Sequence, residues 1–284
     1  MLDMPFKIAL AQMTPKLGDV GSNLEKCLAI IEEAEENGAE VVAFPELALS
    51  GYFLRDLVPE VALKRDSGEL DELKRASYNI DILIGFVEES ASYHFYISAA
   101  YLADGDIKHI HRKVYLPTYG MFEDSRYFAR GERVRAFSGG RMRAGILICE
   151  DATHPLMDYL VAVDGANIIY VMSSSPLRGF GDPHPSSLDN WVKLDQHIAY
   201  TYGIYVVYIN RTGFEDGIGF GGRSHVVDPS GEVCFKADDL EEGLYYTEID
   251  PGQIRRSRII TPMVRDEDIP LMLKELERIY KERE

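Results

Sequence analysis

Apolar and polar residues alternate along the chain in blocks that predict strands and helices in turn. Short apolar runs, typical of buried strands, cover residues 8–13, 41–44, 82–87, 145–148, 168–172 and 205–209. Between these runs, apolar residues recur every three or four positions, which predicts helices over 22–37, 70–77, 155–163, 188–202 and 270–281. We expect the first helix to open on a capping box formed by Ser22 and Glu25, and to end at Gly38.

β-Hairpins interrupt this alternation. Successive strands are predicted at 82–87 and 95–102, and a turn at Asp228 to Gly231 joins strands expected at 224–227 and 232–235. A doubly wound sheet would not contain such hairpins, so the pattern favours a mixed α/β fold in which two sheets stack face to face with helices outside. No Ser/Gly-rich tract or charge block divides the chain, and we therefore expect a single domain over residues 1–284.

Composition narrows the class of protein. Hydrophobic residues make up 46% of the chain, as in ordinary globular proteins. The net charge of −17 argues against nucleic acid or an anionic membrane as a partner, because both would repel the protein. No basic leader precedes an apolar segment, and no run of about 18 apolar residues could span a bilayer. Three scattered cysteines fit a reduced compartment, so we expect a cytoplasmic protein with one functional thiol.

Three reactive side chains stand at or just beyond the ends of apolar strands. Glu46 follows the strand at 41–44, Lys113 lies in the segment 110–117, and Cys149 ends the run at 145–148. A carboxylate, an amine and a thiol are the groups needed for nucleophilic catalysis on a carbonyl or nitrile carbon. Each residue also has a purely structural interpretation. Glu46 could be a solvated strand end, Lys113 part of a surface basic patch, and Cys149 a buried core cysteine.

The surroundings of Cys149 and Glu46 favour reactivity. Glu150 and Asp151 follow the cysteine and suggest that the chain leaves the core there, while Pro155 suits the first turn of a helix whose amino end would favour a thiolate. Apolar neighbours surround Glu46, so we expect its pKa to be raised, as a general base near neutral pH requires. No metal-binding spacing, Walker loop or dinucleotide fingerprint appears, and we expect neither a metal nor a cofactor.

The sequence motifs around these three residues resemble those of the nitrilase superfamily of carbon–nitrogen hydrolases. The matching phrases are FPELALSGY (44–52), HRKVYLPTYGMFEDSRYFARG (111–131) and ICED (148–151), with KIALAQM (7–13) and GGRSHVVDPSGEV (221–233) extending the likeness over most of the chain. This resemblance implies a four-layer αββα sandwich with Cys149 as nucleophile, Glu46 as general base and Lys113 as stabiliser of the negative oxygen. Lys113 would also help to keep Cys149 ionised.

The resemblance also implies supporting residues. Superfamily members place a second glutamate eleven positions after the lysine, where this chain has Asp124, directly preceded by Glu123; either carboxylate could serve. The backbone N–H of Glu150 is a second expected donor to the oxyanion. Within the superfamily the chain is most similar to the glutaminase domain of glutamine-dependent NAD synthetases, here expected to stand alone, and in that branch Tyr119 and Ser175 match substrate-contacting positions. Arg178 is the only basic candidate shortly after Ser175.

Together these features predict a cofactor-independent amidohydrolase that cleaves a C–N bond of a small linear amide through a thioester and releases ammonia or an amine. Two alternatives remain open: a non-catalytic or ammonia-supplying glutaminase-like subunit of a separate synthetase, and an N-carbamoyl hydrolase. We expect the carboxyl-terminal extension, residues 251–284, to lie at an oligomer interface. Its first segment, Pro251 to Met263, mixes isoleucines and a methionine with arginines, which suits an interface better than a free tail, although the segment could also pack on its own subunit. We therefore expect a homodimer or a higher homo-oligomer.

Overall fold

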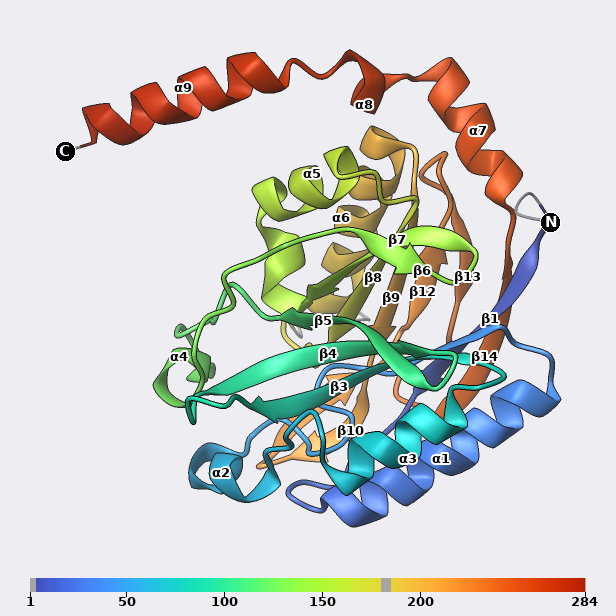
Figure 1. The fold of residues 1–284 in the computed structure, drawn as a ribbon, viewed down its shortest axis with the longest axis vertical. Coiled ribbons are helices and arrows are strands. Elements are labelled where there is room, and N and C mark those ends of the chain that lie inside the picture. Colours follow the sequence, from blue (N-terminus) through green and yellow to red (C-terminus); the bar gives the residue numbers. More distant parts are fainter. Residues whose placement is uncertain (1–3, 180–184, 284) are drawn as a thin grey trace.

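Two six-stranded sheets form the centre of the protein, of which a computed structural model describes residues 4–179 and 185–283 (Figure 1). The first sheet has the order β14-β1-β2-β3-β4-β5. Its strands are β14 (Gly243–Ile249), β1 (Phe6–Gln12), β2 (Val41–Ala43), β3 (Asp81–Glu89), β4 (Phe95–Ala103) and β5 (Asp106–Arg112).

The second sheet has the order β13-β12-β9-β8-β7-β6, and a small hairpin stands apart from both sheets. The strands of the second sheet are β13 (Val233–Lys236), β12 (His225–Val227), β9 (Tyr205–Asn210), β8 (Ile168–Ser173), β7 (Met142–Ile148) and β6 (Phe137–Gly139). The hairpin consists of β10 (Thr212–Glu215) and β11 (Ile218–Gly221).

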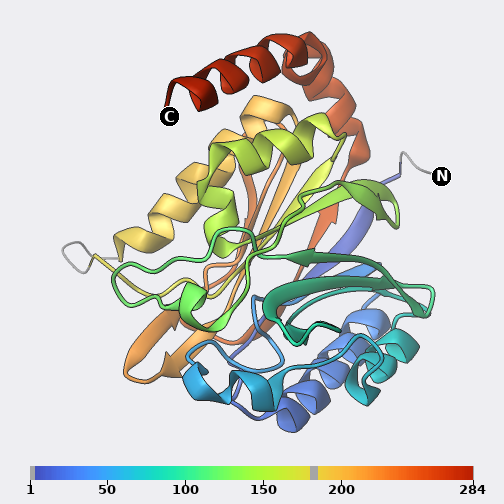
Figure 2. The same cartoon turned by 60° about the vertical axis from the view of Figure 1, so that its left-hand side comes forward.

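Helices cover the outer face of each sheet, which gives four layers (Figures 1 and 2). Helices α1 (Val20–Glu36) and α3 (Gly68–Ala76) pack on the first sheet, and α5 (Pro155–Val163) and α6 (Ser186–Tyr202) pack on the second. The largest apolar cluster lies between the two sheets and contains buried side chains of both, such as Leu10 and Tyr170. The predicted αββα sandwich is thus confirmed.

Strand direction brings the ends of several strands together. Strands β1, β2 and β3 are parallel, and because β4 is antiparallel to both β3 and β5, strand β5 runs in the direction of β2. In the other sheet β7, β8 and β9 are parallel. The carboxyl ends of β2 and β5 therefore point to the same end of the first sheet, and those of β7 and β8 point to the same end of the second.

One local prediction is wrong. Helix α1 begins at Val20 rather than Ser22, and its N-cap is Asp19, whose side chain accepts a hydrogen bond from the Ser22 N–H at 3.1 Å. Ser22 is thus inside the first turn and cannot form the predicted capping box. The helix ends as predicted, with Gly38 in the left-handed region at φ 73°.

Several short elements were not predicted because they are too brief to show a period. They are the 3₁₀ turn Arg55–Leu57, α2 (Val58–Val61), α4 (Asp124–Tyr127), β6, β10 and β11. In the described part of the chain, no helix is both long enough and apolar enough to cross a bilayer.

The carboxyl-terminal extension consists of three helices that reach past the rest of the molecule, shown in red in Figures 1 and 2. They are α7 (Pro251–Ile260), α8 (Met263–Asp266) and α9 (Ile269–Glu282). Helix α7 packs on its own subunit: Ile254 is buried, and the Arg258 guanidinium donates to the Ala166 carbonyl at 2.9 Å. This part of the extension is therefore helical, although the sequence showed no period there. Ile254 is its one buried residue, whereas Ile259 is 64% exposed and Ile260 is 81% exposed.

Helix α9 contains no buried residue, yet it is strongly amphipathic. Its exposed apolar side chains recur at helical spacing: Ile269, Met272, Leu273, Leu276, Ile279 and Tyr280. A helix of this length is marginal in water without a packing partner, because isolated helices below about 12–15 residues are hardly stable. We propose that this apolar stripe packs on a second copy of the chain.

Light scattering tests this proposal. The intact protein should be a dimer or a larger oligomer. A protein cut after Asp268, which keeps α7 and α8, should contain fewer subunits per particle. Leu273→Glu, on the apolar stripe, should weaken the assembly because it places a charge in the contact, whereas Lys274→Glu, on the polar face of the same helix, should not. A monomeric intact protein, or a truncated protein of unchanged oligomeric state, would contradict the proposal.

Candidate active site

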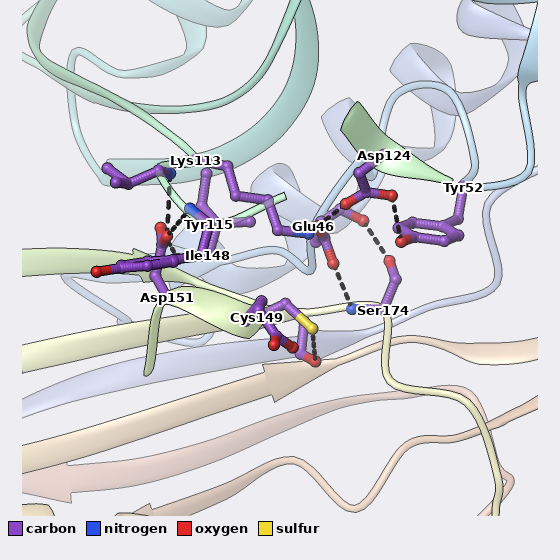
Figure 3. Close-up of polar contacts among 12 residues, drawn as sticks. Glu46, Tyr52, Lys113, Tyr115, Asp124, Ile148, Cys149, Asp151 and Ser174 are labelled. Atoms are coloured by element: carbon purple, nitrogen blue, oxygen red, sulfur yellow. Dashed lines mark hydrogen bonds and ion pairs between the residues drawn. The ribbon is translucent and has the colours of Figure 1, made fainter. Parts of the chain in front are cut away.

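A buried ammonium group held by two carboxylates forms the centre of the candidate site (Figure 3). Lys113 follows β5, and its Nζ lies 2.7 Å from Glu46 Oε1 and 2.8 Å from Asp124 Oδ2. Glu46 follows β2, and Asp124 begins the short helix α4. None of the three side chains exposes more than 5% of its surface. At such depth a charge is stable only when it is paired, so each group depends on the others.

Further hydrogen bonds fix both carboxylates. The Tyr52 hydroxyl donates to Asp124 Oδ1 at 2.6 Å. The Ser174 N–H, just beyond β8, donates to Glu46 Oε2 at 2.9 Å, and the Ser174 hydroxyl donates to the Glu46 carbonyl at 2.9 Å. Strand β3 passes close behind the glutamate: a Cβ on Gly85 would come within 2.6 Å of the Leu47 nitrogen. Glycine at that position therefore lets the backbone of Glu46 lie directly against the sheet.

Cys149 stands at the end of β7 with a strained backbone. Its φ is 48°, in the left-handed region that L-residues seldom adopt, and it opens the 3₁₀ turn Cys149–Thr153. The side chain is 8% exposed, and the Ser173 hydroxyl lies 3.4 Å from its sulfur. Cys149 lines a cavity of about 330 Å³ whose other walls include Phe122, Ser175 and Trp191. The strained turn thus leaves Cys149 lining this cavity, and Figure 3 shows its side chain near Glu46 and Ser174.

The net effect of burial and neighbouring charges is to raise the pKa values of Glu46, Lys113 and Cys149. Burial raises the pKa of Glu46, as the sequence predicts, although Lys113 acts in the opposite direction. Burial lowers the pKa of Lys113, but the charges of Asp124 and Glu46 outweigh burial and hold the pKa well above its ordinary value. Burial and the Glu46 charge raise the pKa of the Cys149 thiol to about 12. The expectation that Lys113 and a helix end keep this cysteine ionised is therefore wrong: Lys113 lowers the pKa, but by less than burial raises it.

Asp151 connects the cysteine turn to the lysine segment. Its Oδ1 accepts hydrogen bonds from the N–H groups of Val114 and Tyr115, both at 2.9 Å, and its Oδ2 lies 2.9 Å from His111 Nε2. The side chain is fully buried, which contradicts the interpretation that the carboxylates after Cys149 mark a departure from the core. By holding the residues that flank Lys113, Asp151 sets the position of the lysine relative to Cys149.

The supporting residues suggested by the sequence fall in different places. Asp124 contacts Lys113, whereas Glu123 is exposed and lies 3.5 Å from Arg126, away from the cluster. Tyr119 is 53% exposed, and its hydroxyl donates to the Glu150 carboxylate at 2.9 Å. Ser175 lines the cavity with Cys149, and its hydroxyl accepts from Trp191 Nε1 at 2.8 Å.

Sequence reasoning missed four residues of the site: Tyr52 as the partner of Asp124, and Ser174, His111 and Asp151. A signal existed for His111, which stands two positions before Lys113 at the end of β5. Within the described ranges, no group of three or more His, Cys, Asp or Glu side chains is placed to hold a metal ion. All three cysteines are free thiols, with Cys27 buried and Cys234 exposed.

Comparison with known proteins places this chain in a family. The profile of the carbon–nitrogen hydrolase family matches residues 7–259. A glutamine-dependent NAD⁺ synthetase from Acinetobacter baylyi is 32% identical over 255 residues, which cover 89% of this chain but 46% of the synthetase. The chain thus spans about half the length of the curated synthetases that it matches.

Two other comparisons extend over whole chains. A probable nitrilase from Schizosaccharomyces pombe is 28% identical over 271 residues, covering 91% of this chain and 94% of that protein. The crystal structure of a carbon–nitrogen hydrolase from Helicobacter pylori superposes with a TM-score of 0.85 at 22% identity, covering 97% of this chain and 99% of that chain. The second comparison supports the fold, since its identity is too low to carry more.

The raised pKa of Cys149 can be measured directly. Because the folded state holds the thiol proton, ionisation should occur only far above neutral pH. The ultraviolet thiolate absorbance of the wild type minus that of Cys149→Ser, which retains Cys27 and Cys234, should stay flat from about pH 6 to about pH 9. Glu46→Gln should shift the ionisation to lower pH, since the Glu46 charge raises this pKa. A wild-type step with a midpoint below about pH 8 would contradict the assignment.

Proposed function

The chain belongs to the carbon–nitrogen hydrolase family, and from this premise we propose that it is a cysteine-dependent amidohydrolase that cleaves small linear amides. The observation that carries the proposal is the buried Glu46–Lys113–Asp124 cluster beside a cavity lined by Cys149. This arrangement supports Glu46 as the acid–base group, Lys113 as a fixed cation and Cys149 as the nucleophile.

The first half of the reaction forms a thioester. A neutral thiol is a weak nucleophile, so Glu46 accepts the Cys149 proton as the sulfur attacks the carbonyl carbon. The raised pKa of Glu46 suits this transfer, because a carboxylate that binds protons readily is a stronger base. Negative charge develops on the carbonyl oxygen, and the Lys113 ammonium and the backbone N–H of Glu150 stabilise it. When the C–N bond breaks, Glu46 gives its proton to the departing nitrogen, which leaves as ammonia or an amine.

The second half consumes water. Glu46, again ionised, takes a proton from a water molecule as its oxygen attacks the thioester carbon. The C–S bond then breaks, the carboxylic acid leaves, and the proton returns from Glu46 to the sulfur. Asp124 pairs with Lys113 in both halves of the reaction. The ammonium group therefore stays in place when Glu46 gains or loses its proton. Removing one such oxyanion donor typically lowers kcat by about 100- to 1,000-fold.

The cavity suggests a small polar substrate. Its volume of about 330 Å³ is at the lower end of small-molecule sites, and its polar lining includes Thr153, Ser175 and Asn190. Arg178 also lines it, with its guanidinium 4.8 Å from the Phe122 ring centroid. A cation there could pair with a substrate carboxylate, as the α-carboxylate of glutamine would require. Glutamine is therefore the first amide to test.

A second function is favoured by the likeness to glutamine-dependent synthetases. In this alternative the chain is a glutaminase-like unit that supplies ammonia to a separate synthetase, and free turnover is slow without that partner. An N-carbamoyl hydrolase is a third alternative with the same nucleophile. The acyl group that occupies the cavity distinguishes these possibilities.

One experiment tests covalent catalysis and the substrate class together. Ammonia release should be measured on glutamine, other primary amides, N-carbamoyl compounds and nitriles. Cys149→Ala should fold normally and lose nearly all activity, because no other side chain of the cavity supplies a thiol, whereas Cys234→Ala should keep it. Mass spectrometry of acid-quenched turnover should show the acyl group of the substrate on the peptide containing Cys149.

An adduct on Cys27 or Cys234 would refute the nucleophile assignment. The absence of turnover on every compound, with Cys149 also unreactive toward iodoacetamide, would refute the enzyme proposal. Slow glutamine turnover with normal adduct formation would favour the ammonia-supplying alternative, and turnover restricted to carbamoyl compounds would favour the third.

A further inference from the structure

Arginines gather around a second cavity, on the edge of the first sheet, in a chain whose net charge is −17. The cavity has a volume of about 500 Å³ and is lined along β5 by His109 and Ile110. Its arginines come from β5, from the segment that follows α4, and from the segment after α2: Arg65, Arg112, Arg130, Arg133 and Arg135. Strand β5 is the outermost strand of the first sheet, so no further strand covers this side (Figure 1).

Carboxylates neutralise only part of this charge. Glu88 pairs with Arg112 through two contacts of 2.8 Å and with Arg65 at 2.9 Å. Among the described residues that line the cavity, Glu132 is the only acidic one. Five guanidinium groups therefore face two carboxylates, which leaves a formal excess of three positive charges.

Three arginines are available to a ligand. Within the ranges that the structure describes, Arg130, Arg133 and Arg135 make no ion pair with a carboxylate, and all three are exposed. Arg130 lies 5.1 Å from the centre of the Tyr115 ring. The same field acts on His109: burial, His111 and Arg135 lower its pKa to about 4, so it adds no charge at neutral pH.

We propose that this cavity binds a small polyphosphorylated molecule. Guanidinium groups bind phosphate oxygens in pairs, and several of them around one hollow favour a ligand with several adjacent negative charges. The volume lies in the range of about 300–1,000 Å³ typical of small-molecule sites. A nucleic acid would need a longer basic surface and would be repelled by the rest of this acidic chain.

The cavity shares its backbone with the catalytic lysine. Arg112 directly precedes Lys113, and the Gly131 N–H, next to Arg130, donates to the Lys113 carbonyl at 2.8 Å. A ligand that draws Arg112 and Arg130 together would therefore act on the two segments that position Lys113. Binding itself does not depend on the proposed hydrolase activity, and it is measured without a substrate.

Isothermal titration calorimetry in a phosphate-free buffer tests the proposal, with pyrophosphate, ATP and citrate as separate ligands. Pyrophosphate or ATP should bind, and citrate, which offers carboxylates alone, should bind more weakly. Arg133→Glu and Arg135→Glu should each weaken binding about tenfold or more, since each loses a charge-assisted contact worth about 1.5–3 kcal/mol. Arg75→Glu, the same charge change at an exposed position of α3, should bind as the wild type does.

Binding of ATP without pyrophosphate would show that a nucleoside is also recognised, which agrees with the proposal. Four results would overturn it: no binding of either phosphate compound, equal binding of citrate, equal loss in Arg75→Glu, or tighter binding of an RNA oligonucleotide with the same dependence on Arg133. Thermal unfolding of each variant verifies that it is folded, and since both mutated arginines are exposed, we expect unchanged unfolding temperatures.

Discussion

The active site depends on one buried ammonium group between two carboxylates. Lys113, Glu46 and Asp124 are shielded from water, and removing one partner of such a buried pair typically costs about 3–5 kcal/mol because a charge is left uncompensated. This requirement fixes three separate segments of the chain relative to one another. Burial and the negative charge of Glu46 also raise the pKa of the Cys149 thiol, which favours its neutral form.

The sandwich supplies these constraints from both sheets. The first sheet delivers Glu46 and Lys113, and the second delivers Cys149 and Ser174, each just beyond a strand. Asp151 then ties the cysteine turn to the backbone after Lys113. A shift of one sheet against the other would break these contacts together. The site is therefore positioned mainly by the regular elements of the fold.

The sequence could predict Glu46, Lys113 and Cys149, because each follows an apolar strand and lies within a distinctive sequence motif. It could not predict the contacts of Tyr52 and Ser174, whose partners lie 72 and 128 positions away and are chosen by the packing of the two sheets. It could not separate Glu123 from Asp124, because adjacent residues differ only in which one the fold buries. The capping error at α1 has a local cause: Asp19 caps the helix by accepting the Ser22 N–H, so Ser22 already lies inside the first turn.

The central claim is that Asp124 fixes the position from which Lys113 acts. Comparing the activities of variants at Asp124 and at the adjacent Glu123 tests this claim most directly. The value of kcat/KM should be measured on the most active amide for Asp124→Asn and Glu123→Gln, with thermal unfolding of both. The account predicts a loss of about 100-fold for Asp124→Asn, the size expected when a catalytic group is misplaced, and an almost unchanged value for Glu123→Gln. Equal losses in two folded variants, or a larger loss in Glu123→Gln, would contradict it.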